Sequence, residues 1–381
     1  MTAHSIVGAS AAKRWLTCPG SVRLIERLTK LGALDEDTSE YAEDGTFAHR
    51  VLEICIAEGD VIADAIWRTA DEVKRTAPAW CEEVVSEVLD TLAPLMGGAY
   101  WAEHKVTFGR PEHGAFGTLD FAALTNGGAK LTVADLKTGV GVRVSAQKNP
   151  QLLCYALGHL AQLSPEQQAK VQLIRLQVLQ PRLPGGIVHW DCTIEWLREW
   201  ERATLLPGLD TARAGSDKLE TGDHCQFCPA ALFCAARQAE VQRAELFADA
   251  APEQLSDDAI LSFLESGARI RKFLALVEAY ALKKALAGAP PAGYKLVAGK
   301  ANRTWRDEAA PVLEMLLGDE AYEPRKLRSP AQIEELPGGK ALALTYGYAP
   351  QGAPTLAPVD DTRAAYQRPT AVSMFTPVKS E

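Results

Sequence analysis

The spacing of apolar positions changes along the chain, and each change marks a different kind of element. Apolar residues first recur at helical spacing, with a Pro-Gly pair interrupting the first helix. Alternation of apolar and polar positions then predicts three strands joined by turns, as in a meander. The predicted helices span residues 9–31, 40–58, 71–95, 149–163, 194–213 and 252–287, and the predicted strands span 101–108, 114–124, 130–139, 170–181 and 186–193.

This order of elements predicts an α/β or α+β fold with a mixed sheet. The character of the chain changes after Ala250, where residues 294–305 resemble a hairpin and the stretch from about 349 is rich in Pro, Ala and Thr. We therefore expect one domain over residues 1–240 and an extension of helices and a hairpin over 250–348. Residues 349–381 are expected to form a poorly ordered tail.

The composition is that of a soluble globular protein, with 47% apolar and 23% charged residues. No run of 18 or more apolar residues predicts a membrane span, and the first residues do not resemble a secretory signal. A cytoplasmic location is therefore expected, where thiols stay reduced. The eight cysteines then indicate metal binding or simple burial rather than disulfides.

Charge is distributed unevenly along the chain. The net charge of −9 argues mildly against a nucleic-acid partner, but residues 267–306 hold nine basic residues and one acid. That window has a net charge of +8 and leaves −17 for the rest. It is either a nucleic-acid contact surface, with Tyr294 and Trp305 available for base stacking, or a solvated helix face.

Carboxylates and a lysine stand at the ends of two predicted strands. Asp135 and Lys137 in "VADLKTG" project from the same face, because residues two apart in a strand point the same way. Asp120 in "GTLDF" lies on the preceding strand. Two carboxylates on neighbouring strands suit a hard cation such as Mg²⁺. The alternatives are a surface ion pair for Asp135 and Lys137, and an edge-strand aspartate for Asp120.

Three polar residues occupy helix faces near these strands. His49 in "DGTFAHRVLE" is expected to point inward with the apolar face of its helix, where a histidine is often a hydrogen-bonded core residue rather than a ligand. Gln151 and Tyr155 in "NPQLLCYALGHL" lie one turn apart on the next helix. Each residue has an ordinary explanation when it is taken alone.

Taken in order, the motifs "GTFAH", "GTLD", "DLK" and "QLLCY" between Gly45 and Tyr155 resemble those of the PD-(D/E)XK nuclease superfamily, most closely its RecB-type branch. The resemblance implies a restriction-endonuclease-like core, a mixed central sheet flanked by helices, with a helical C-terminal extension. It implies that His49, Asp120 and Asp135, with the Leu136 carbonyl, bind Mg²⁺ or Mn²⁺.

The same resemblance assigns roles to the remaining motif residues. Lys137 would orient the attacking water and stabilise developing charge, and Gln151 and Tyr155 would contact DNA or steady the site. Glu103, on the first predicted strand, is a further candidate as a supporting or second-metal residue. The implied chemistry is phosphodiester hydrolysis, in which the metal activates water and neutralises charge on the phosphate oxygens.

Three cysteines lie close together in "HCQFCPAALFC", namely Cys225, Cys228 and Cys234. A tetrahedral site needs a fourth ligand, and Cys18 in "RWLTCPGS" is the candidate, since a Pro-Gly pair there could expose its thiol. One cysteine before the nuclease core and three after it resemble the AddB-type iron–sulfur nucleases of the same superfamily. The resemblance implies a [4Fe–4S] cluster that ties the two ends of residues 1–240 together. A Zn²⁺ site with the same ligands is the alternative.

These observations predict a metal-dependent DNA exonuclease acting in recombination or DNA end processing. The layout also resembles an uncharacterised phage and prophage family of the superfamily. Expected partners are single- or double-stranded DNA ends and either a single-strand annealing protein or a helicase. "AVSMF" at residues 371–375 resembles peptides that dock on a sliding clamp. The alternative function is a nuclease-like module that binds DNA or a partner protein without cleaving.

Overall fold

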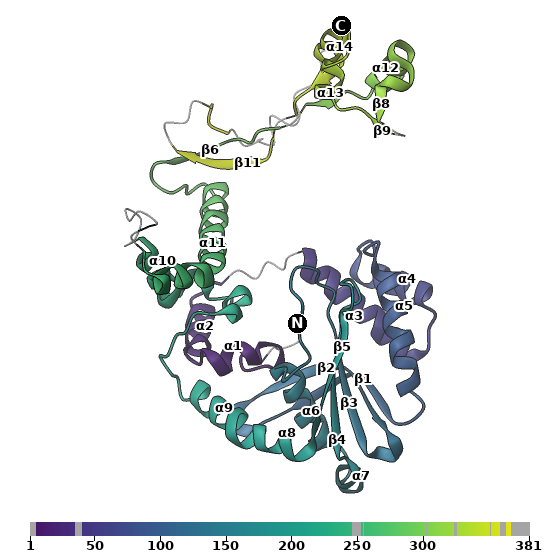
Figure 1. Cartoon of the computed structure of the whole chain (residues 1–381), viewed down its shortest axis with the longest axis vertical. Coiled ribbons are helices and arrows are strands. Elements are labelled where there is room, and N and C mark those ends of the chain that lie inside the picture. Colours follow the sequence, from purple (N-terminus) through teal and green to yellow (C-terminus); the bar gives the residue numbers. More distant parts are fainter. Residues whose placement is uncertain are drawn as a thin grey trace. The chain divides into compact units, whose positions relative to one another are not determined.

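A computed structural model describes residues 5–34, 40–245, 253, 255–301, 303–323, 326–350, 352–358 and 363–366 (Figure 1). The chain divides into two compact units, Met1–Phe273 and Leu274–Glu381. The first unit therefore extends past residue 240, and it takes in α10 (Ala235–Glu245) and the first half of α11 (Asp257–Leu286).

The first unit is built on a five-stranded mixed sheet with the strands in chain order. The parallel pair is β3 with β4, joined by α6 (Pro150–Gln162), and the other neighbours run antiparallel. This confirms the predicted α/β fold with a mixed central sheet flanked by helices. The strands are β1 (Tyr100–Thr107), β2 (Phe116–Thr125), β3 (Lys130–Leu136), β4 (Leu173–Leu179) and β5 (Ile187–Thr193).

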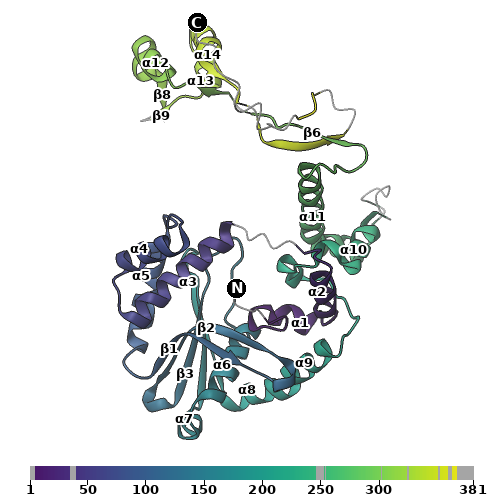
Figure 2. The same cartoon turned by 180° about the vertical axis from the view of Figure 1, so that it is seen from behind.

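Helices cover both faces of this sheet (Figures 1 and 2). Alternate residues of β2 face opposite layers: Phe121 and Ala123 join one apolar core, and Ala122 and Leu124 join the other. The first core lies under α3 (Glu40–Glu58), α4 (Ile62–Val73) and α5 (Cys81–Leu92), and the second under α1 (Ala12–Thr17), α6, α8 (Ile194–Trp200) and α9 (Leu206–Arg213).

The helix predicted over residues 71–95 is two helices in the structure. Lys74 adopts a left-handed backbone with φ of 53°, which ends α4, and α5 begins only at Cys81. Pro78 lies between them and restricts the residue before it to extended backbone. The apolar periodicity on both sides of this break hid it from the sequence pattern.

The N-terminal helices are attached to a segment far along the chain. The interruption predicted at the Pro-Gly pair separates α1 from α2 (Gly20–Lys30). The Gly20 amide donates to the Lys218 carbonyl at 2.9 Å, and Arg23 pairs with Asp217 at 2.7 Å. The two ends of the first unit are therefore held side by side.

In the second unit, the hairpin that was predicted over residues 294–305 is wrong. Instead, β6 (Tyr294–Ala298) pairs with β11 (Pro354–Pro358), and β7 (Thr304–Trp305) pairs with β10 (Gly347–Tyr348). Its core lies among helices and short strands, with Leu313 and Ile333 fully buried. The other elements are α12 (Ala309–Leu317), β8 (Tyr322–Glu323), β9 (Lys326–Leu327), α13 (Pro330–Glu334) and α14 (Gly339–Tyr346).

The predicted tail over residues 349–381 falls mostly outside the described residues. Within that range the structure describes 349–350, 352–358 and 363–366, and β11 is part of it. The clamp-like stretch at 371–375 lies outside the described residues. Across the part of the chain that is described, no helix combines the length and apolar character needed to cross a bilayer.

His159 on α6 is a buried histidine without a hydrogen-bond partner for either ring nitrogen among the described residues. It is 1% exposed, and the Trp101 ring lies edge-on to it with 4.4 Å between centroids. Burial, followed by the neighbouring His104, lowers the pKa of His159 to about 4. The folded protein therefore holds this imidazole neutral.

Acid should destabilise the protein through His159. The unfolded chain protonates this residue near pH 6.5, whereas the folded chain resists protonation until about pH 4, so stability falls as pH decreases through that window. The His159→Phe variant should lose about 2.5 kcal/mol less than the wild type between pH 7 and 4.5. Urea unfolding at both pH values measures this. A His189→Phe control, at an exposed position, should behave like the wild type, and equal losses in all three proteins would contradict the prediction.

Candidate metal centre

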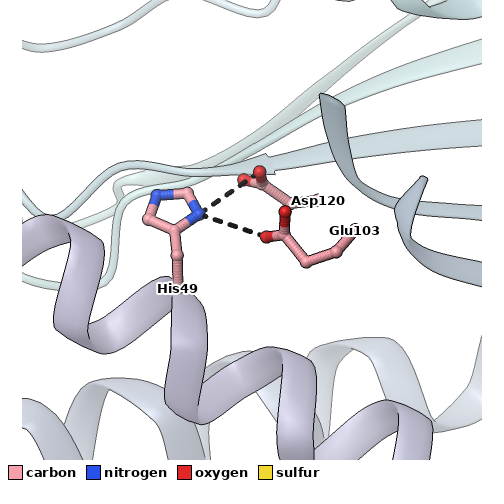
Figure 3. A group of neighbouring side chains, drawn as sticks. All are labelled: His49, Glu103 and Asp120. Atoms are coloured by element: carbon pink, nitrogen blue, oxygen red, sulfur yellow. Dashed lines mark ion pairs between the residues drawn. The ribbon is translucent and has the colours of Figure 1, made fainter. Parts of the chain in front are cut away.

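Three potential ligand atoms meet at one end of the sheet (Figure 3). His49 comes from α3, Glu103 from β1 and Asp120 from β2. The His49 Nδ1 atom lies 3.2 Å from Asp120 Oδ1 and 3.8 Å from Glu103 Oε1. All three ligand atoms lie within 4.8 Å of one another, and no other set of three His, Cys, Asp or Glu side chains in the described ranges does so.

Strand register explains why Glu103 and Asp120 meet. Ala102 pairs with Phe121 and His104 pairs with Leu119, so Glu103 and Asp120 stand opposite each other between these pairs. Glu103 also has a left-handed backbone, with φ of 43°, in the middle of β1. A non-glycine residue in this conformation costs about 1–3 kcal/mol, and such strain is concentrated at functional sites.

Asp120 is fixed where β2 and β3 part. The backbone pairing of these strands reaches Phe121–Ala134, and beyond it the Leu136 amide donates to Asp120 Oδ2 at 2.6 Å. The carboxylate thus replaces the backbone carbonyl that would have continued the ladder. In the structure, Leu136 contacts the site through its N–H group, which binds Asp120. The expected role of its carbonyl as a metal ligand stays a prediction.

Asp135 and Lys137 form a second polar group with residues of α6. Lys137 Nζ lies 2.6 Å from Asp135 Oδ2 and donates to Gln151 Oε1 at 3.3 Å. Gln151 Nε2 donates to Asp135 Oδ1 at 2.7 Å and to the Tyr155 hydroxyl at 3.2 Å. The Asn149 side chain caps α6 by accepting from the Gln151 and Leu152 amides. The structure therefore joins all four predicted residues in one hydrogen-bonded chain.

The electrostatics follow from burial and close opposite charges. Burial alone would lower the pKa of His49, but the charge of Asp120 and hydrogen bonds to Asp120 and Glu103 raise it to about 10. For Asp120, the penalty of burial is outweighed by His49, and its pKa lies below the usual range. Burial raises the pKa of Asp135 even though Lys137 opposes this, while Asp135 and then Asp120 raise the pKa of Lys137 against its own burial.

Glycines let helices approach the site closely. A Cβ atom at Gly45 would lie 3.2 Å from Thr138 Oγ1, which brings α3 against the end of β3. A Cβ atom at Gly117 would lie only 2.8 Å from Tyr155 Cε1 and 3.1 Å from the Ala9 methyl. The glycines of "GTFAH" and "GTLD" thus have a packing reason that does not depend on any motif.

Gly117→Ala should destabilise the first unit and displace Tyr155. Overpacking of this kind costs about 1–3 kcal/mol, because Tyr155 is buried and cannot swing into solvent. Urea unfolding measures the loss. Gly97→Ala, where an added Cβ meets nothing within 4 Å, is the matched control. Equal stabilities for the two variants would contradict the expected clash.

The four cysteines that were predicted to bind a cluster lie near one another in the first unit, in a polar region separate from the candidate metal centre. The Glu220 amide donates to Cys18 Sγ at 3.4 Å across a sequence separation of 202 residues. The Glu220 carbonyl lies 3.9 Å from Cys225 Sγ. Cys228 and Cys234 directly follow two short 3₁₀ helices, Asp223–Phe227 and Ala231–Phe233, and all eight cysteines of the chain are free. Glu220 therefore bridges Cys18 to the cysteine segment.

A buried cation accompanies these thiols. Arg14 is buried and donates to Ser21 Oγ at 2.9 Å. Burial lowers the pKa of Arg14, and the nearby Cys228 and Cys18 act in the opposite direction. Burial raises the pKa of Cys228, against a hydrogen bond from Ala230 and the charge of Arg14. A positive charge thus lies where several thiolates would need one.

The sequence made Glu103 a candidate as a supporting or second-metal residue, and in the structure it belongs to the set of three ligand atoms. The set does not include Asp135, which was also predicted to bind metal. The available signal for Glu103 was its place opposite Asp120, which requires the strand register.

Over residues 4–364 the chain matches the family described as "Protein of unknown function (DUF2800)". A crystal structure of a candidate exonuclease from Eubacterium rectale shares 12% identity, with a TM-score of 0.34 over 59% of this chain and 86% of that one. The crystal structure of SSO0001 shares 13% identity, with a TM-score of 0.28 over 57% and 94%. Neither likeness is close enough to carry a functional argument.

Proposed function

The chain belongs to the DUF2800 family, whose function is unknown, and from its site we propose that it is a metal-dependent DNA nuclease. The observation that carries this proposal is the convergence of His49, Glu103 and Asp120 beside the buried Asp135–Lys137 pair. Acidic groups and a lysine concentrated at one sheet end suit phosphodiester hydrolysis, because that reaction needs both a cation site and a positive donor near the phosphate.

The donor set fits a hard divalent cation. Carboxylate oxygens are the ligands that Mg²⁺ and Mn²⁺ prefer, and a nitrogen ligand such as His49 is compatible with Mn²⁺. Asp120 is almost fully buried, and in the protein alone its charge is offset by His49. Such a cation would supply positive charge for the phosphate oxygens and lower the pKa of a bound water.

The residues of the chain would divide the remaining work. Asp120, Glu103 and His49 would hold the cation, with Asp135 beside them. Hydrolysis joins a water oxygen to phosphorus and breaks one phosphorus–oxygen ester bond. Lys137, held by Asp135 and Gln151, would place its ammonium group beside the phosphate and stabilise the charge that develops there. Tyr155 would keep Gln151 in place.

The alternative is a nuclease-like module that binds DNA or a partner protein without cleaving it. Buried charges are costly, and a non-cleaving protein has no evident need to hold two carboxylates and a lysine together. This favours the nuclease, but a protein that binds cations without hydrolysis would also use His49, Glu103 and Asp120. Activity separates the two functions.

The test is a cleavage assay on end-labelled single- and double-stranded DNA with Mg²⁺, Mn²⁺ or a chelator. The nuclease proposal expects metal-dependent cleavage, and shortening from one end would indicate an exonuclease. Asp135→Asn should abolish cleavage, whereas Asp191→Asn, which changes a surface pair with Arg175 on β4 and β5, should not. If the wild type cleaves no substrate with either metal, the binding module is the better description.

We also propose that Cys18, Cys225, Cys228 and Cys234 hold a [4Fe–4S] cluster. The Glu220 backbone contacts both Cys18 and Cys225, so the first of these cysteines lies beside the segment that holds the other three. One cysteine before the core and three after it is the arrangement that resembles the iron–sulfur nucleases, and Zn²⁺ with the same four ligands is the alternative. Protein purified without oxygen should be brown with about four iron per chain, and zinc without a visible absorption band would favour the alternative.

The biological setting remains part of the proposal. The exonuclease would act on DNA ends in recombination or end processing, in a phage or prophage context. A single-strand annealing protein, a helicase or a sliding clamp would be the protein partner. Polarity and product length in the same cleavage assay would show which class of end is used.

A further inference from the structure

A loop of eleven residues connects the end of β3, which carries Asp135 and Lys137, to α6, which carries Gln151. This site loop, Thr138–Lys148, begins directly after Lys137 and ends directly before Asn149, which caps α6 two residues before Gln151. At its start, the Lys137 amide donates to the Leu179 carbonyl at 2.8 Å. Both ends of the site loop are therefore fixed by elements that carry site residues.

A buried glutamine holds the middle of the site loop. Gln180 is 1% exposed, and its Nε2 atom donates to the Gly139 and Val142 carbonyls at 2.7 and 2.8 Å. Its Oε1 atom accepts from the Val144 amide at 3.0 Å. One side chain thus pairs three backbone groups of a loop that has no ladder of its own.

Two arginines tie the site loop to the turn between β4 and β5. Arg143 donates to the Gly185 and Pro184 carbonyls at 2.9 and 2.7 Å. Arg182 donates to the Thr138 carbonyl at 3.1 Å and stacks over the Trp80 ring at 4.4 Å. With Gln180, these contacts join the two neighbouring loops at several points.

Two valines are exposed on the site loop. Val140 is 51% exposed and Val142 is 44% exposed, while Gln180 holds the Gly139 and Val142 carbonyls and the Val144 amide. A single exposed apolar residue is ordinary, but these two lie two residues apart on a loop whose backbone is held on both sides of them. Fixing the loop in advance lowers the entropy cost of binding an apolar surface there.

We propose that Val140 and Val142 pack against a nucleobase of the strand whose phosphate enters the candidate site. This inference rests on the proposed nuclease function. The site loop runs from Lys137 to the helix of Gln151, so a strand held beside Lys137 passes next to it. Apolar side chains that meet bases in this way read no sequence but require an unstacked base. The enzyme would then favour unpaired or frayed DNA.

Abasic nucleotides test this contact directly, because they remove the base and leave the phosphate backbone. A series of labelled single-stranded oligonucleotides would each carry one abasic nucleotide at a different position. Binding is measured by fluorescence anisotropy with Ca²⁺ in place of Mg²⁺. For the wild type we expect affinity to fall about five- to tenfold at one or two neighbouring positions.

The Val140→Ser/Val142→Ser variant should bind intact DNA as weakly as the wild type binds the sensitive abasic strand, and should be insensitive to abasic nucleotides. Val61→Ser, at an exposed valine on α4's N-terminus, should behave like the wild type. Unchanged thermal unfolding shows that the variants are folded.

The base contact is overturned if the wild type binds no oligonucleotide, or if an abasic nucleotide leaves its affinity unchanged at every position. It is also overturned if the double variant remains sensitive to abasic nucleotides. Absence of cleavage with abasic-sensitive binding retained would overturn only the proposed nuclease function. The anisotropy and cleavage measurements therefore separate the two failures.

Discussion

Replacing Lys137 by methionine should lower the DNA cleavage rate about 10²–10³-fold while leaving DNA affinity almost unchanged. Methionine keeps the length of the side chain and removes its charge. The lost ammonium group lies 2.6 Å from Asp135 Oδ2 and is aligned by Gln151, so its effect should fall on the reacting phosphate rather than on binding. Single-turnover cleavage and anisotropy measure the two quantities separately.

The same variant has a second expected property. Without Lys137, the buried Asp135 and Asp120 lose one of their compensating cations, so the metal-free protein should be less stable. Added Mg²⁺ should then stabilise the variant more than the wild type in thermal unfolding. Lys170→Met removes an exposed lysine on α7 (Pro165–Lys170) and should change neither property. A cleavage rate within threefold of the wild type would remove Lys137 from the proposed mechanism.

Replacing Cys18 by serine should have the largest effect on stability. Serine is a poor iron ligand, and Cys18 is the proposed ligand at the end of α1, beside the cysteine segment through its contact with Glu220. We expect iron to fall from about four per chain to a small fraction of that value. The thermal midpoint should fall by about 5–10 °C, because a link between the two ends of the first unit is lost.

Cys192→Ser is the control for this experiment. Cys192 on β5 is buried to a similar degree as Cys18 but lies among the apolar residues of the core. Its replacement should cost stability while retaining iron and the visible absorption. If both variants keep their iron, Cys18 is not a ligand. If iron is absent from the wild type but one zinc is bound, the ligands would hold zinc instead.

Local pattern predicted most of the first unit. Alternation in "GAFGTLDFAAL" and "KLTVADLKTG" predicted β2 and β3, and the order of strands and helices predicted the mixed sheet that the structure has. The polar residues stood out because Asp120 and Asp135 interrupt apolar strands where a solvated charge is unusual. These signals lie within a few residues of one another, so they need no tertiary information.

Pairing between strands far apart in the sequence was the part of the fold that the sequence pattern did not predict. β6 pairs with β11, about sixty residues away, and β11 begins and ends with the prolines Pro354 and Pro358. Prolines are unusual within strands, so the pattern favoured a local hairpin instead. Glu103 was underestimated for a related reason. Its position opposite Asp120 and its left-handed backbone depend on the register of β1 with β2.

The attachment of α2 to the segment around Lys218 affects the order in which the protein forms during synthesis. The Gly20 amide and Arg23 find their partners only after about two hundred further residues have been made. At roughly 5–20 residues per second, α1 and α2 would wait about 10–40 seconds beside the ribosome without them. The sheet and α6 can pack during this time. The contacts of α2 with the segment around Lys218 would then form after the sheet has packed, and the cysteine set would be completed only at that step.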